Sequence, residues 1–195
     1  MTGVQTCALP ILSSAAGLTY DPTGDWSGTD TLSVLVNDLG NSGAGGIQTA
    51  TDSSVTIAVS AVNDGPTITV GTTTFSTTED TSVVITGVSV DDVDENGNDI
   101  QVVLGVGDGL LTVSTTVGTG LSGGEITNNG TGSVTLLGTV TQINDTLSSA
   151  AGLTYDPTGD WSGTDTLSVL VNDLGNSGAG EIGRASCRER VCHRV

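Results

Sequence analysis

Basic residues are almost absent from this sequence. Lysine does not occur, and the four arginines and the single histidine all lie at or beyond position 184. Of the 22 acidic residues only Glu181 and Glu189 lie outside residues 12–180, which leaves 20 acidic side chains and no base in that stretch. Binding to nucleic-acid phosphates and attraction to anionic lipid both depend on Lys or Arg, so neither partner is expected. Divalent cations are instead the partners expected for such an acidic chain.

The usual catalytic side chains are also missing. The cysteines (Cys7, Cys187 and Cys192) lie outside residues 12–180, as does the histidine. That stretch therefore lacks the common bases and nucleophiles of enzymes, and paired carboxylates, as in a glycosidase, are the only chemistry left. We predict no enzymatic activity. No apolar run approaches the roughly eighteen residues of a membrane helix, so we expect no membrane insertion.

Aromatic residues are scarce, and the core is expected to consist of Val, Leu and Ile. The apolar pattern has mainly period two and is interrupted by Gly, Asn and Asp, which favours short antiparallel strands joined by turns. One exception is Thr141–Ala151, where Ile143 and Leu147 are spaced as on one face of a helix. The sequence predicts an all-β fold with a single short helix there. Strands are predicted at 31–36, 54–62, 67–70, 82–90, 100–104, 110–115, 133–137, 153–155 and 166–171.

A stretch of 34 residues occurs twice. Leu12–Gly45 recurs letter for letter as Leu147–Gly180, at an offset of 135 residues. Such a recurrence is typical of a tandem array, in which the repeat unit is the object to interpret. The segment Ala61–Pro66 separates two strand-like runs, and its proline cannot join a central ladder, so it predicts a domain boundary.

The two ends resemble translated sequencing adapters. Met1–Ile11 matches an in-frame reading of a common short-read adapter, and Glu181–Val191 matches the opposite adapter. Residues 1–11 and 181–195 are therefore interpreted as adapter-derived and set aside. Residues 12–62 are then the C-terminal part of one repeat, and residues 63–180 a second repeat without its last strand. A copy of that strand is predicted at Ser54–Val62, which creates a hazard of strand swapping.

The most distinctive local motif is the acidic segment Asp91–Asp99. Asp92, Asp94 and Asn96 alternate before Gly97, which brings several oxygen atoms to one side of a loop, as Ca²⁺ requires. The twelfth position is Val103, where an EF-hand needs Glu, so the motif is not an EF-hand. The alternative is a solvated hairpin loop in which Asn96 and Gly97 form a type I′ turn.

Further acidic side chains follow strand ends near the same boundary. Singly, each is more typical of an Asx turn than of a metal ligand, but together they suggest a cation site. The candidate metal ligands are Asp38, Asn63, Asp64, Glu79, Asp80, Asp92, Asp94 and Asn96. Asp173 is the counterpart of Asp38 in the second copy.

The order of motifs resembles that of one family. The segments NDGP, TEDT, DVDENG, DGLLTV, GSVTLLGTVTQIN, LTYDP and WSGTDTLSVLVNDLGNSGAG together resemble the cadherin-like repeats of giant bacterial surface adhesins. The resemblance implies cadherin-like or immunoglobulin-like β-sandwich repeats, each with one short helix, displayed outside the cell. It also implies Ca²⁺ at repeat junctions, with several ions expected. Asn63, Asp64, Glu79, Asp80, Asp92 and Asp94 match junction positions, whereas Ala61 replaces the first linker aspartate.

The expected function is that of a calcium-stiffened spacer in a secreted or surface-anchored adhesin that supports cell adhesion or biofilm formation. Its expected partners are neighbouring repeats and cell-surface or matrix glycans. The alternative is a calcium-dependent carbohydrate-binding module in which Trp161 stacks on a sugar. A lone Trp between Asp and Ser-Gly more often closes the end of a sandwich, and that interpretation is kept beside it.

Overall fold

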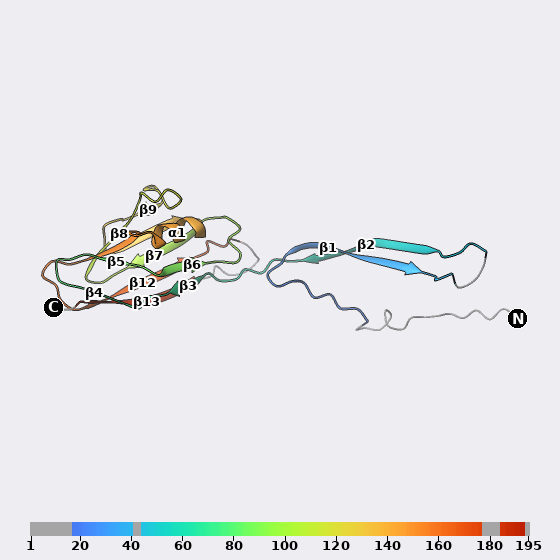
Figure 1. Cartoon of the computed structure of the whole chain (residues 1–195), viewed down its shortest axis with the longest axis horizontal. Coiled ribbons are helices and arrows are strands. Elements are labelled where there is room, and N and C mark those ends of the chain that lie inside the picture. Colours follow the sequence, from blue (N-terminus) through green and yellow to red (C-terminus); the bar gives the residue numbers. More distant parts are fainter. Residues whose placement is uncertain (1–16, 41–43, 177–183, 194–195) are drawn as a thin grey trace. The chain divides into compact units, whose positions relative to one another are not determined.

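The chain forms two compact units, Met1–Val59 and Ser60–Val195, each described here by itself. The computed structural model describes residues 17–40 and 44–176, and the backbone of residues 184–193. Nearly all of the regular structure is β-strand, with one helix among the described residues, which confirms the all-β class (Figure 1).

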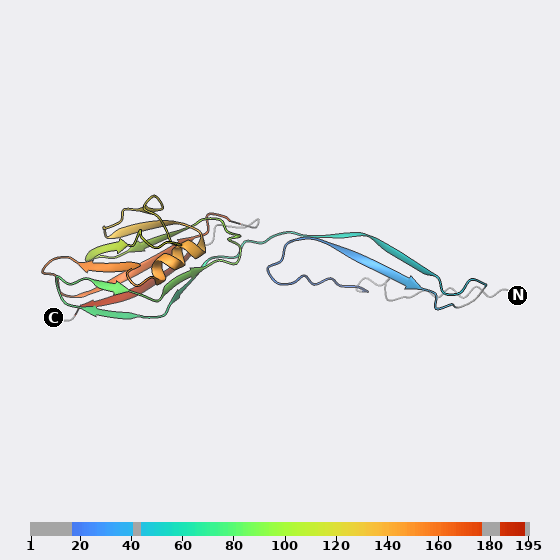
Figure 2. The ribbon, with the colours of Figure 1, turned by 45° about the horizontal axis from the view of Figure 1, so that its top comes forward.

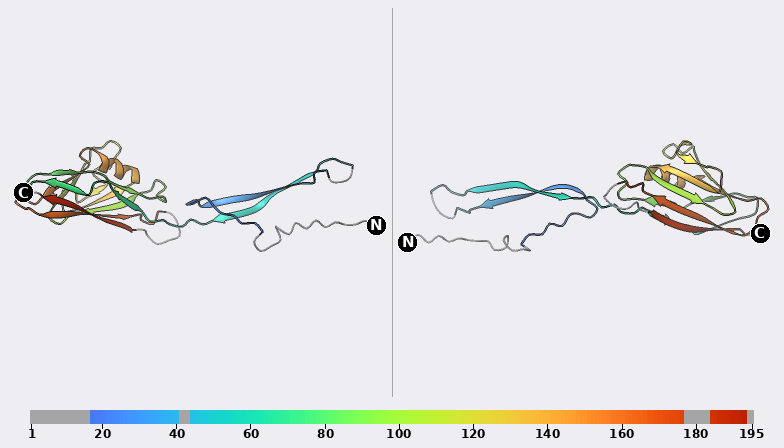
Figure 3. Two further views of the ribbon diagram at one scale, coloured as in Figure 1. Left: turned by 60° about the horizontal axis from the view of Figure 1, so that its bottom comes forward. Right: turned by 180° about the vertical axis from the view of Figure 1, so that it is seen from behind.

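Unit 1 is a single antiparallel hairpin. It consists of β1 (Gly28–Asn37) and β2 (Thr49–Val59), with a register shift between Leu32 and Val34. Both strands are mostly exposed, and within the described part of this unit no second sheet lies against them (Figure 3). The strand-rich, alternating sequence is enough to form the hairpin, but a hairpin alone cannot bury its apolar face.

Unit 2 contains the remaining described elements. They are β3 (Thr67–Val70), β4 (Thr74–Thr77), β5 (Val83–Ile85), β6 (Val88–Asp91), β7 (Ile100–Gly105), β8 (Gly109–Val113), β9 (Ile126–Thr127), β10 (Ser133–Gly138), α1 (Val140–Ser148), β11 (Leu153–Pro157), β12 (Thr164–Asn172) and β13 (Arg184–His193). The strands form a six-stranded sheet in the order β4-β13-β12-β7-β10-β9, a three-stranded sheet β5-β11-β8, and the pair β3-β6. Among the described strands of unit 2, only β4 and β13 pair in parallel.

One apolar core lies between these elements. The burial of β7, β8 and β12 alternates along each strand, as the period-two pattern predicts. The core combines residues from the six-stranded sheet, such as Leu104 and Val169, with residues from the three-stranded sheet, such as Leu111 and Tyr155. It is built from Val, Leu and Ile apart from Tyr155, in agreement with the composition.

Helix α1 covers part of this core. It packs against β6 and β10 (Figure 2) and buries Ile143 and Leu147, the two residues whose spacing predicts a helix. Thr139 begins it with a capping box, in which its side chain accepts from the amide of Gln142 and the Gln142 side chain reaches back. The helix runs from Val140 to Ser148, so it begins one residue before the predicted start at Thr141 and ends three residues before the predicted end at Ala151.

The position beside β12 is filled by β13. The pairs Val34–Asp52 and Val169–Cys187 lie in the two hairpins, and the second pair lies 135 positions after the first on both strands. The β12–β13 ladder thus has the register with which Val34–Asn37 pair with Thr49–Asp52 in β1–β2. It continues along all of β12 without the register shift of β1–β2. The sequence predicts that the second repeat lacks a closing strand, whereas residues 184–193 pair along β12 at that place.

Two asparagine side chains cover the edges of β6 and β8 at the buried residues Val90 and Val113. The Asn144 carboxamide accepts from the amide of Val90 and donates to its carbonyl, at 2.9 and 2.8 Å. Asn129 binds both backbone groups of Val113 in the same way, at 2.7 and 2.8 Å. Each carboxamide thereby satisfies one residue of β6 or β8 as a neighbouring strand would.

Candidate functional site

The candidate site is a group of oxygen-bearing side chains at one end of unit 2. We call Asn63, Asp92, Asp94 and Asp173 the acidic cluster. They come from three segments: the start of the unit, the loop after β6, and the turn after β12. The three aspartates are buried, with 5 % of Asp92 and 1 % of Asp173 exposed, which is rare for carboxylates without a basic partner. No Lys, Arg or His occurs in residues 17–176.

Hydrogen bonds tie the three segments together. The Asn63 carboxamide donates to Asp173 Oδ2 at 2.7 Å, and the Asp64 amide donates to Asp94 Oδ2 at 2.5 Å. The amide of Asp94 donates to Asp92 Oδ1 at 2.9 Å. The first two contacts join residues 110 and 30 positions apart in sequence, so the folded unit creates the cluster.

Asp92 is the buried carboxylate of the cluster with an unsatisfied oxygen. Its Oδ2 is buried and accepts no hydrogen bond from any residue that the structure describes. Burial raises the pKa of Asp92 above its ordinary value, opposed by the amide of Asp94, and the charges of Asp173, Asp94 and Glu95 raise it further. A cation next to Oδ2 would remove both the repulsion and the unsatisfied acceptor.

The loop after β6 contains the turn expected in the hairpin interpretation. Asn96 and Gly97 both have positive φ, of 46° and 77°, and the Asn98 amide donates to the Glu95 carbonyl at 2.7 Å, as in a type I′ turn. The Asn96 side chain is exposed and donates to the carbonyl of Asp94. The turn therefore holds Asp92 and Asp94 inward and leaves Asn96 at the surface.

The other predicted ligands lie elsewhere. Asp80 has φ of 60° and accepts from the Asp160 amide at 3.2 Å, before β12 begins, whereas Asp173 follows the end of β12. A strand of that length extends roughly 30 Å, so Asp80 and its neighbour Glu79 do not join the cluster. Asp64 contributes its amide, while its side chain is exposed.

Asp38 belongs to unit 1. There it accepts from the amides of Gly40 and Gln48, and these bonds lower its pKa. Its counterpart Asp173 makes the same turn contact, to Gly175, but also accepts from Asn63. The fold therefore shows that Asp173 is the member of the pair that joins the cluster. The recurrence at offset 135 identifies the two residues as counterparts but does not choose between them.

The cluster supplies suitable atoms for a hard cation but is not a closed site. Carboxylate and amide oxygens are the ligands that Ca²⁺ prefers. Among the side chains described, those of residues 17–40 and 44–176, no three acidic, histidine or cysteine side chains are grouped closely enough to hold a metal ion. The cluster thus fits Ca²⁺ in the chemical type of its oxygen atoms and in the unsatisfied Asp92 Oδ2. Binding of an ion would require the loops that carry these oxygens to move closer together.

A second acidic position is structurally satisfied. Asp165 is buried and accepts from the amides of Gly107, Asp108 and Thr166 and from the hydroxyl of Tyr155, at 2.7–3.1 Å. Burial and the Asp165 charge raise the pKa of Tyr155, which stays a hydrogen-bond donor. With four donors, Asp165 fixes the start of β12 and has no capacity left for a ligand.

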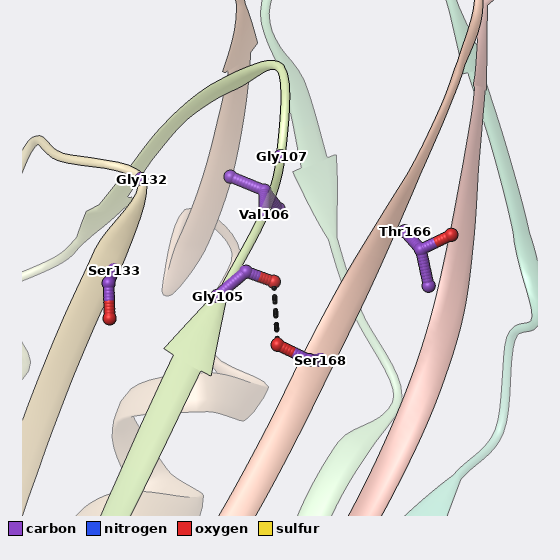
Figure 4. Close-up of a pocket in the computed structure, with 7 residues that line it drawn as sticks. All are labelled: Gly105, Val106, Gly107, Gly132, Ser133, Thr166 and Ser168. Atoms are coloured by element: carbon purple, nitrogen blue, oxygen red, sulfur yellow. Dashed lines mark hydrogen bonds between the residues drawn. The ribbon is translucent and has the colours of Figure 1, made fainter.

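A hollow of about 330 Å³ lies beside β7 and β12 (Figure 4). It is lined by Gly105–Gly107, Gly132–Ser133, Thr166 and Ser168, and the Ser168 hydroxyl donates to the Gly105 carbonyl at 3.1 Å. No acidic or aromatic side chain lines it. Trp161, the aromatic residue of the sugar-binding alternative, is not part of it. A β-carbon at Gly163 would lie 2.8 Å from the Trp161 ring, which shows that the indole packs over that glycine.

Within the described part of the chain, no helix is long and apolar enough to cross a membrane. Comparisons with protein-family models, curated proteins and solved structures gave no match. Function must therefore be inferred from the site itself.

Proposed function

We propose that this chain comes from a secreted or surface-anchored bacterial adhesin and serves there as a structural spacer of cadherin-like, immunoglobulin-like β-sandwich repeats. Calcium bound at the acidic cluster stiffens the spacer, which supports adhesion or biofilm formation. The observation that carries the proposal is the burial of three aspartates at one end of unit 2, where Asp92 feels the charges of Asp94 and Asp173 and keeps one oxygen unsatisfied. The letter-identical recurrence over 34 residues supports the tandem arrangement.

The chemistry of the cluster supports a cation over simple solvation. Three carboxylates held together without a base repel one another, and burial increases that repulsion because water cannot screen it. Calcium ions would neutralise them and use the oxygens of Asp92, Asp94, Asp173 and Asn63. When bound, the ion supplies charge neutralisation and crosslinks the three segments, and this converts a self-repelling end into a rigid one.

Titration with calcium tests this proposal. Extracellular modules of this kind bind Ca²⁺ with Kd of about 10⁻⁴ to 10⁻³ M. At 10 mM Ca²⁺ and a Kd of about 1 mM, binding would stabilise unit 2 by about 1.4 kcal/mol, or a few degrees in Tm. Calorimetry and thermal melting measure both quantities, with Mg²⁺ as the comparison ion.

The two copies offer a matched pair of variants. Asp173→Asn should abolish the calcium-dependent rise in Tm, whereas Asp38→Asn, in the same local sequence, should leave it unchanged. A calcium response that survives Asp173→Asn, or no response in the parent chain, would reject the cluster as the binding site. An equal response to Mg²⁺ would show nonspecific screening instead.

A further inference from the structure

The sequence contains two Asn-Gly pairs, Asn96–Gly97 and Asn129–Gly130. In such a pair the amide nitrogen of the glycine can attack the side-chain carbonyl carbon of the asparagine, because glycine has no side chain that hinders the approach. The attack forms a C–N bond and closes a five-membered succinimide ring, and the carboxamide nitrogen leaves as ammonia. Water then opens the ring and gives aspartate or isoaspartate. All four residues are exposed, so exposure alone does not distinguish the two pairs.

The Asn129–Gly130 pair is held against β8. The Asn129 carboxamide accepts from the Val113 amide and donates to the Val113 carbonyl, at 2.7 and 2.8 Å. The Gly130 amide, which would be the nucleophile, donates to the Leu111 carbonyl at 2.9 Å. Ring closure would break these bonds and leave backbone groups of two buried residues unsatisfied. A backbone carbonyl is also too weak a base to take the proton of the attacking amide.

The Asn96–Gly97 pair has a different acceptor at its nucleophile. The Gly97 amide donates to Glu95 Oε2 at 2.7 Å, within the distance over which a general base takes a proton. A carboxylate, unlike a carbonyl, can accept that proton as the nitrogen attacks. Ring closure also turns the Asn96 carboxamide away from the Asp94 carbonyl, to which it donates at 3.0 Å. That bond lies within the same loop, so its loss uncovers no strand edge.

We propose that Asn96 is a site of spontaneous deamidation in the folded protein, with Glu95 as the general base, and that Asn129 is protected from the same reaction. The proton of the Gly97 amide passes to Glu95 and then to the departing nitrogen, which leaves as ammonia. One water molecule opens the ring. The product carries a carboxylate in place of a neutral side chain, and isoaspartate also adds a methylene group to the backbone.

The modification changes the loop that carries Asp92 and Asp94. An added negative charge and a longer backbone both act next to these two buried carboxylates, so the acidic cluster would change as the protein ages. The inference rests on the contacts of the two Asn-Gly pairs and needs no bound calcium. It can therefore fail while the proposed function holds, and the reverse is equally true.

Peptide mapping of the aged protein tests the choice of site. Full-length chain is kept at neutral pH in EDTA for several weeks, and mass spectrometry follows the replacement of –NH₂ by –OH at each pair. An isoaspartate-specific methyltransferase identifies the isoaspartate product. Asn96 should react at least about tenfold faster than Asn129, because fewer hydrogen bonds to the strands must break. In urea, where the fold is absent, the two should react at similar rates. Equal rates in the folded chain, or a difference that persists in urea, would overturn the proposal.

Glu95→Gln tests the general base. Glutamine keeps an acceptor for the Gly97 amide but cannot take its proton, so deamidation of Asn96 should slow by about tenfold or more. Asp99→Asn is the matched control, since it removes one negative charge from the same loop and leaves the Glu95 carboxylate in place. Its Asn96 rate should stay close to that of the parent. The slow reaction at Asn129 reports in each variant that the fold is intact. An unchanged Asn96 rate in Glu95→Gln, or equal slowing in both variants, would overturn the proposal.

Discussion

At the scale of single residues, Asp92 combines a role in the cluster with a cost in stability. Its carboxylate is buried beside two others, and one of its oxygens has no hydrogen-bond donor among the described residues. A buried unsatisfied polar group destabilises a fold by about 1–3 kcal/mol. Such a cost is typical of residues retained for a ligand.

Asp92→Asn should therefore stabilise unit 2 in the presence of a chelator. The substitution removes a repelling charge and introduces an amide donor next to Asp94 and Asp173, so we expect a gain of up to about 1–3 kcal/mol in the free energy of unfolding. Urea denaturation in EDTA measures this gain. Asp145→Asn, on the helix and outside the cluster, is the control and should change little. A loss of stability in EDTA would show that the Asp92 carboxylate is needed by the fold itself.

The sequence predicts some of these residues and misses their grouping. Alternation in Asp92-Val93-Asp94 identifies two buried carboxylates, and Asn63 follows from the boundary motif. The choice between Asp38 and Asp173 cannot be made from letters alone, because the two sites have the same neighbours in sequence. Only the fold shows that Asp173 meets Asn63. The fold likewise places Asp80 outside the cluster, where its carboxylate accepts a hydrogen bond from the Asp160 amide.

At the scale of elements, helix α1 depends on its first turn. It has nine residues, no acidic residue in the first turn and no basic residue in the last, so the capping box at Thr139 supplies its main end stabilisation. Short helices are marginal without packing and caps.

Thr139→Ala should lower the free energy of unfolding of unit 2 by about 1 kcal/mol, the usual cost of losing an N-cap side chain. Thermal melting or urea denaturation measures it. Thr141→Ala is the matched control: Thr141 is exposed on the same helix, and alanine there should be neutral or slightly stabilising. If both variants behave alike, the cap carries no stability of its own.

Strand positions follow well from alternation, and the exceptions have physical reasons. The predicted strand at 82–90 is two strands, β5 and β6, separated at Gly87, whose φ of 80° breaks the extended backbone. The strands β4 and β9 have no predicted counterpart. Within the described residues β4 pairs only with β13, and β9 has two residues, so their existence depends on tertiary pairing more than on local pattern.

At the scale of the whole molecule, stability is concentrated in unit 2. All of the buried apolar residues found in the described part of the chain belong to that unit. Unit 1 contributes a hairpin with a largely exposed apolar face, and isolated two-stranded hairpins are marginally stable in water.

Paired substitutions in the two copies measure this difference. Val171→Ala should lower the free energy of unfolding by about 2 kcal/mol or more, since it removes two buried methyl groups and leaves a cavity. Val36→Ala changes an exposed residue in identical sequence and should shift it by less than about 0.5 kcal/mol. Urea denaturation of the two variants gives the comparison. Similar losses would mean that Val36 is covered in solution.

The carboxamides of Asn129 and Asn144 have a consequence for behaviour at high concentration. Each occupies the backbone donor and acceptor of a strand-edge residue, on β8 and β6. Backbone groups of this kind are the ones through which edge strands of neighbouring molecules associate into fibrils. The Asn129 carboxamide acts together with the backbone of Thr131, which pairs with Leu111 on the same edge of β8, and the Asn144 carboxamide acts together with α1, which packs against β6. A chain rich in β-structure is thereby protected from amyloid-like stacking at these two edges without any need for charge.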